Sequence, residues 1–114
     1  MPTGSQTYNG VYTVGVRNGD WAETGTVEMT ANFDMGTFNL NAVSNDTNLR
    51  GSGFIDANNG RMSGSSLTFT DIDLGTYSAT TYGSIGGANG TEAAGVWHTN
   101  DNNNDFAGAY AVSR

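Results

Sequence analysis

"TVEMTANFD" occupies residues 26–34 and "TFNLNAV" occupies residues 37–43, with Met35 and Gly36 between them. Apolar and polar residues alternate in both segments. In an extended chain every second side chain points to the same side, so the alternation places the apolar residues on one face. These residues are Val27, Met29, Ala31, Phe33, Phe38, Leu40 and Ala42. The pattern predicts two antiparallel strands joined by a tight turn, with one face buried and the other in water.

Similar segments recur along the rest of the chain at roughly 8–14-residue spacing, separated by turn signals such as NDTN and NNG. About eight short strands joined by sequential hairpins favour an up-and-down antiparallel β-barrel, because closure removes the exposed sheet edges. A barrel of that size has an interior that side chains fill. The sequence therefore predicts an all-β, soluble barrel of about eight strands with a filled interior, in which Leu67, Phe69 and Ile72 also point inward.

Glycine is abundant, with 17 residues, whereas the chain has a single proline and no segment with a sustained helical period. Four glycines fall inside predicted strands, where they mark bends or close approaches of the backbone. They are Gly53, Gly64, Gly95 and Gly108. The 114 residues have the size of one domain. We expect a flexible N-terminal segment at residues 1–7 and a single barrel domain at residues 8–114.

The charge of the chain limits its partners. Eleven acidic residues stand against four arginines and no lysine, for a net charge of −7. Nucleic acids need clustered cations, so they are not expected as partners. A basic partner or a divalent cation suits this charge better. The chain has no apolar run long enough for a membrane-spanning helix, and the alternate face of residues 26–43 is too polar for a barrel in lipid.

Catalytic groups are few. The chain has no cysteine and one histidine, His98. No serine lies in a nucleophile elbow, and a carboxylate pair such as Asp71 and Asp73 would find no cleft on a filled barrel. We therefore expect that the protein is not an enzyme.

Residues 75–112 read GTYSATTYGSIGGANGTEAAGVWHTNDNNNDFAGAYAV. This segment resembles the end of the β-barrel domains in the transferrin-binding protein B-like family of bacterial surface lipoproteins. The resemblance rests on Tyr82, Gly83, Ala88, Asn89, Glu92, Gly95, Val96, Trp97, Phe106, Gly108 and Ala109. It implies an eight-stranded soluble barrel, either secreted or held at the outer leaflet of the outer membrane of a Gram-negative bacterium. A lipid anchor in the full-length precursor would suit that location.

The resemblance also implies a binding protein that recognises its partner through loops and the barrel exterior. The partner would be a host protein, for example one that carries iron or haem, or a component of the cell envelope. Candidate contact residues are Trp21, Tyr82, Trp97 and His98, since exposed aromatic side chains commonly anchor interfaces. Two alternatives stay open: a self-associating structural subunit of a surface layer or filament, and capture of haem or another small ligand.

Two cofactors are considered, although neither is required by the pattern. Asp101, Asn103 and Asp105 place oxygen ligands at alternate positions, as in the first part of a calcium-binding loop, but the later ligands of such a loop are missing. Haem would need an axial partner for His98. The residues considered for that role are Met35, Met62, Tyr77 and Tyr110.

Overall fold

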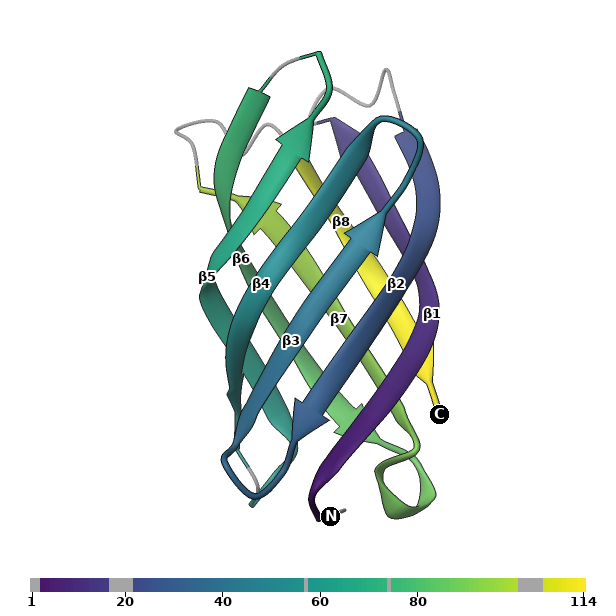
Figure 1. Ribbon diagram of the computed structural model, residues 1–114, viewed down its shortest axis with the longest axis vertical. Coiled ribbons are helices and arrows are strands. Elements are labelled where there is room, and N and C mark those ends of the chain that lie inside the picture. Colours follow the sequence, from purple (N-terminus) through teal and green to yellow (C-terminus); the bar gives the residue numbers. More distant parts are fainter. Residues whose placement is uncertain (1–2, 17–21, 57, 74, 101–105) are drawn as a thin grey trace.

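The computed structural model describes residues 3–16, 22–56, 58–73, 75–100 and 106–114, and it shows a closed barrel of eight antiparallel strands (Figure 1). The strands are β1 (Ser5–Val16), β2 (Ala22–Asn32), β3 (Thr37–Val43), β4 (Thr47–Ile55), β5 (Arg61–Asp71), β6 (Gly75–Gly86), β7 (Glu92–Thr99) and β8 (Phe106–Ser113). Each strand pairs with the next, and β8 returns to pair with β1. The predicted all-β, eight-stranded barrel is confirmed.

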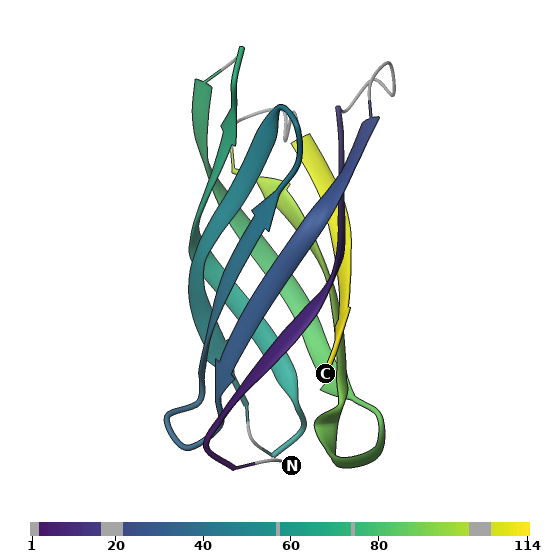
Figure 2. The ribbon, with the colours of Figure 1, turned by 45° about the vertical axis from the view of Figure 1, so that its right-hand side comes forward.

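The barrel is elongated and has two different ends (Figures 1 and 2). The connections β2–β3, β4–β5 and β6–β7 lie at one end, which also holds the start of β1; we call it the turn end. The short 3₁₀ helix η1 (Ala88–Gly90) lies within the β6–β7 connection. The connections β3–β4 and β5–β6 lie at the opposite end, together with the start of β2 and the end of β7.

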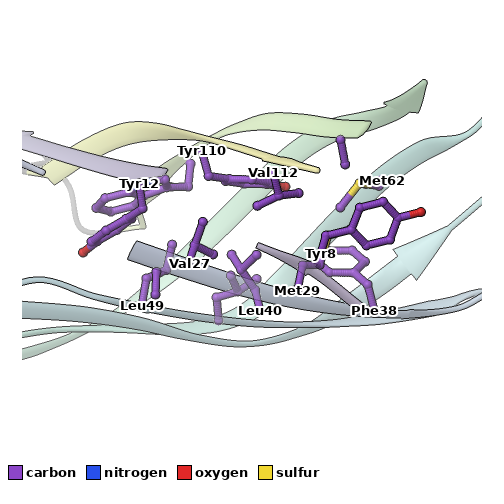
Figure 3. Packing of buried hydrophobic residues seen from close by; sticks show 14 of the residues in the cluster. Tyr8, Tyr12, Val27, Met29, Phe38, Leu40, Leu49, Met62, Tyr110 and Val112 are labelled. Carbon is purple, nitrogen blue, oxygen red and sulfur yellow. The ribbon is translucent and has the colours of Figure 1, made fainter. Parts of the chain in front are cut away.

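The alternation that predicted β2 and β3 is observed directly. Met29 pairs with Leu40, and Ala31 pairs with Phe38, across the two strands. All four side chains are buried. Figure 3 shows Val27, Met29, Phe38 and Leu40 packed against side chains from the facing wall of the barrel, including Tyr110. The apolar face of the hairpin therefore lies inside the barrel, as expected.

Aromatic side chains fill much of the interior. Trp97 stacks on Tyr12 and on Phe69, with ring centroids 6.0 Å and 4.9 Å apart. Phe69 also contacts Phe106 at a centroid distance of 4.7 Å. These large rings come from four strands and meet near the barrel axis, so the space inside is occupied by the protein's own side chains. This packing confirms the predicted filled interior.

Glycines inside strands allow the close approaches that were predicted. A Cβ atom on Gly53 would collide with the backbone oxygen of Ser63 and with the ring of Phe38. A Cβ atom on Gly95 would lie 2.5 Å from the Tyr110 hydroxyl oxygen. Gly64 lies where the register between β5 and β6 shifts. Inward-facing glycines thus make room for the aromatic side chains of neighbouring strands.

Two predicted boundaries need correction. Ile72 was expected to point inward, but 72% of it is exposed. Leu67, Phe69 and Asp71 occupy the inward positions of β5, so the next residue, Ile72, points the other way as the strand ends. The expected N-terminal segment is also shorter than residues 1–7, because Ser5 already pairs with Asn32 of β2.

Candidate partner-binding surface

The outer side of β6, β7, β8 and β1 carries an uncharged surface. Two rows of directly paired residues cross these four strands. The first row is Tyr82, Val96, Ala109 and Thr13, and the second is Ser84, Ala94, Ala111 and Val11. Cross-strand neighbours of this kind lie about 5 Å apart, so the eight side chains form one continuous area. We call this area the alanine face.

Large residues point inward and small ones outward in this part of the barrel. In β8, Phe106, Tyr110 and Val112 are buried, whereas Ala109 and Ala111 are exposed. The small alanine side chains leave a shallow groove of about 470 Å³ over Val11, Ala94 and Ala111, and Glu92 lines the same groove at the start of β7. Tyr82, Val96 and Val11 rise from this surface with 57%, 56% and 54% of each residue exposed. Exposed apolar residues gathered in one area are typical of a contact surface.

The structure separates the four predicted contact residues. Tyr82 lies on the alanine face, and His98 lies beside it, one outward position beyond Val96 on β7. The Nδ1–H group of His98 donates a hydrogen bond to the backbone oxygen of Thr99, 3.1 Å away. Trp97 is only 1% exposed and belongs to the core, so its predicted direct contact with a partner is corrected. Trp21 lies outside the described residues.

A second groove lies beside the alanine face, and its main residue was missed by sequence reasoning. Phe54, Ser63 and Tyr82 are directly paired across β4, β5 and β6. Phe54 is 70% exposed, and the groove between it and Tyr82 has a volume of about 720 Å³. We call this the aromatic groove. The signal was present in the sequence, because the inward positions of Gly53 and Ile55 leave Phe54 pointing outward.

Arg61 lies at the turn end of the aromatic groove. Its guanidinium forms no hydrogen bond or ion pair with any residue that the structure describes. Nearby, the Asp56 carboxylate accepts a hydrogen bond of 2.9 Å from the backbone N–H of Asn58, which stabilises the β4–β5 turn. The groove therefore combines two exposed aromatic rings with a cation that is available to a ligand.

A chain of hydrogen bonds closes the end of the barrel opposite the turn end. The hydroxyl groups of Tyr12 and Thr47 are 2.7 Å apart, and that of Thr47 is 2.6 Å from the hydroxyl of Ser44. Ser44 donates in turn to the carboxylate of Glu23, which also accepts from the backbone N–H of Asp46 at 3.1 Å. Burial raises the pKa of Tyr12 to about 12, so this hydroxyl stays protonated and serves as a structural group.

The turn end is closed by the glycine-rich β6–β7 connection. The Tyr8 hydroxyl donates to the backbone oxygen of Gly90 over a distance of 2.5 Å. Arg114 donates to the Gln6 side chain at 2.8 Å and to the backbone oxygen of Asn89 at 2.9 Å. Asn89 has a positive φ of 60°, a conformation that asparagine adopts more readily than most residues. This connection therefore holds the first and last strands together.

The cofactor candidates are not brought together. Met62 and Tyr110 are buried, and Tyr77 packs against the core, whereas His98 points away from it. Met35 lies in the β2–β3 turn, at the other end of the barrel from His98. None of the four shares a face with His98.

The calcium candidates Asp101, Asn103 and Asp105 lie outside the described residues. Within the described part of the chain, no group of three or more histidine or acidic residues could hold a metal ion. The described residues also include no helix long and apolar enough to cross a membrane.

These features define a class of protein, the closed eight-stranded barrel with a filled interior. The surfaces available for ligand binding in such a protein are the outer wall and the two ends. Solved structures that share this fold include a surface lipoprotein, with a TM-score of 0.72. They also include a point mutant of the vaccine antigen transferrin-binding protein B from Actinobacillus pleuropneumoniae H49, with a TM-score of 0.75.

Both matches cover 98% of this chain and 62% of the solved chain, at 12% sequence identity. The chain thus spans less than two thirds of the length of either solved structure. The sequence matches no protein-family model and no curated protein. The likeness confirms that this chain has the barrel fold found in transferrin-binding protein B, as the resemblance of residues 75–112 predicted.

Proposed function

We propose that this chain is a binding domain without catalytic activity, presented at the bacterial surface or secreted, and that it recognises a protein partner through the alanine face. The observation that carries the proposal is the uncharged pair of rows across β6, β7, β8 and β1. An exposed apolar area with an aromatic residue at its edge is the kind of surface that proteins bury on association.

The structural neighbours support the same proposal. One is described as a surface lipoprotein, and the other is named for binding transferrin. A location on the outer leaflet of a Gram-negative outer membrane follows from this likeness as part of the proposal. A host protein that carries iron or haem is the first class of partner to test. Calcium binding at residues 101–105 and haem capture at His98 stay predictions.

The test compares two variants in a capture experiment. Ala109→Arg places a long charged side chain in the centre of the alanine face. Asn39→Arg adds the same group to the exposed, polar outer side of β3 and serves as the matched control. Each purified chain is immobilised and exposed to host serum and to envelope extract, and bound proteins are identified by mass spectrometry. Binding is then measured with the purified partner.

The proposal predicts a protein that binds the wild type and Asn39→Arg but is lost with Ala109→Arg. Equal capture by both variants would place the contact elsewhere. If the immobilised chain captures a second copy of itself, sedimentation of the free protein should show a dimer, and Ala109→Arg should convert that dimer to a monomer. In that case the partner is a second copy, and the structural-subunit alternative is correct.

A further inference from the structure

The aromatic groove has a chemistry different from that of the alanine face. Its two walls are the exposed side chains of Phe54 and Tyr82, which come from strands on either side of β5. Two strand spacings separate them by about 10 Å. Ser63 lies between them, and Ser84 lies on β6 beside Tyr82, one row nearer the turn end; both serine residues are exposed. The groove is thus apolar at its sides and hydroxylated along its base.

Arg61 and Asp56 both line the turn end of the groove, and the Asp56 carboxylate already accepts a hydrogen bond from the backbone N–H of Asn58. Arg61 pairs with Ser84 across β5 and β6, so it lies one outward row from Ser63 and Tyr82. Of the three described arginines, Arg114 is held by Gln6 and Asn89, whereas Arg61 and Arg50 have no polar partner among the described residues. The Arg61 guanidinium is therefore available to a ligand. It favours a ligand that carries a carboxylate, which arginine can bind through two parallel hydrogen bonds.

We propose that the aromatic groove is a binding site for an acidic saccharide. A sugar ring has apolar C–H faces that pack on aromatic rings, and it has hydroxyl groups that exchange hydrogen bonds with serine. The carboxylate of a sugar acid would lie at Arg61. The two strand spacings between Phe54 and Tyr82, about 10 Å, leave room for one six-membered sugar ring. An apolar peptide side chain would match the walls but would leave the serine hydroxyls and Arg61 without partners.

This proposal is separate from the protein-binding function. Phe54 and Arg61 lie outside the alanine face, whereas Tyr82 and Ser84 belong to both surfaces. The groove is open to solvent, so binding should be weak, with a dissociation constant on the order of 1 mM for a disaccharide or trisaccharide. Nuclear magnetic resonance titration suits this range.

The experiment uses the ¹⁵N-labelled 114-residue chain. Two acidic probes, 3′-sialyllactose and cellobiouronic acid, are titrated beside their neutral counterparts, lactose and cellobiose. At least one acidic sugar should shift the amide signals of Ser63, Tyr82 and Ser84 and should bind at least tenfold more tightly than its counterpart. A hydrogen bond to a charged group contributes a factor of roughly 10–100 in affinity. The proposal fails if neither acidic sugar shifts these signals, or if acidic and neutral sugars bind equally.

Variants locate the site. Arg61→Ala should weaken binding of the acidic sugar at least tenfold, and Phe54→Ala at least fivefold. Arg50→Ala removes the same charge from β4 outside the groove and should leave binding unchanged. Retention of wild-type affinity by Arg61→Ala would overturn the proposal. So would a tetraglutamate peptide that shifts the same signals with equal affinity, because the groove would then recognise charge alone. Ala109→Arg should leave sugar binding unchanged, so this test and that of the protein partner can fail independently.

Discussion

The indole nitrogen of Trp97 donates a hydrogen bond to the backbone oxygen of Thr13, 3.2 Å away, although β8 lies between their strands. On β8, the residue that lies beside this hydrogen bond is Gly108. A Cβ atom there would collide with the Thr13 oxygen and lie 2.9 Å from the Trp97 nitrogen. The last two strands and the first are therefore linked through the barrel interior, where the chain closes on itself.

Gly108→Ala should destabilise the barrel by about 1–3 kcal/mol, because the added methyl group must displace Trp97 or the backbone of β1. Gly86→Ala is the matched control, since a Cβ atom at that position would meet nothing within 4 Å. Urea denaturation of the two variants and the wild type gives the comparison. Equal unfolding midpoints for both variants would show that the contact does not contribute to closure.

Tyr12→Phe should lower the free energy of unfolding by about 0.5–1.5 kcal/mol. The variant keeps the ring stacked on Trp97 and removes only the hydroxyl that is 2.7 Å from that of Thr47. Thr47 keeps its contact with Ser44, so no buried group is left without a partner. Thermal unfolding of Tyr12→Phe and of Thr47→Val should give similar losses, and the double variant should lose less than their sum.

The stability of the barrel should fall between pH 10 and pH 12. Burial raises the pKa of Tyr12 from its ordinary value of 10.0 to about 12, and it also raises the pKa of Tyr8 and Tyr110. In this range the unfolded chain has lost phenolic protons that the folded chain keeps, so the free energy of unfolding decreases as the pH rises. Urea midpoints at several pH values measure the slope. Tyr12→Phe should have a shallower slope than the wild type, and an identical slope would show that Tyr12 does not contribute.

The same substitution at Phe38 and at Phe54 compares the stability contributions of an inward-facing and an outward-facing ring. Phe38 is 1% exposed and Phe54 is 70% exposed. Phe38→Ala should cost about 3–5 kcal/mol, because it leaves a cavity in the core. Phe54→Ala should change stability by no more than about 0.5 kcal/mol. Denaturation curves measured in parallel check the difference, and a large loss for Phe54→Ala would mean that its ring is packed rather than available to a ligand.

Arg114→Ala should loosen the β6–β7 connection without unfolding the barrel. Its guanidinium holds Gln6 and the backbone of Asn89, and it lies 5.8 Å from the ring centroid of Tyr8. Because the interaction is exposed, the global loss should stay below about 1 kcal/mol. Hydrogen exchange should become faster at residues 87–91, while exchange in β2 and β3 is unchanged. Arg50→Ala, with the same loss of charge, should leave residues 87–91 as they are in the wild type.

The candidate surfaces could be predicted only in part. Tyr82 was predicted to be an exposed contact residue, and it is exposed on the alanine face; its contact with a partner stays a prediction. Trp97 was placed on the same surface, yet it is buried, since its large ring fills space that the neighbouring strands leave beside Gly108. The role of Phe54 depends on Tyr82, which follows it by 28 positions in the printed sequence and meets it only through the register of β5.

The sequence by itself determined the strands, their inward and outward faces and the closed barrel. The reason is that alternation with a period of two is a local property, and it can be read within a few residues, as in residues 26–43. The tertiary structure decided which distant residues meet: Trp97 with Thr13 through the gap at Gly108, and Phe54 with Tyr82 across Ser63. The proximity of these residues depends on the register between strands and on the curvature of the closed barrel wall. Both are set by the packing of the whole interior, and no single segment contains them.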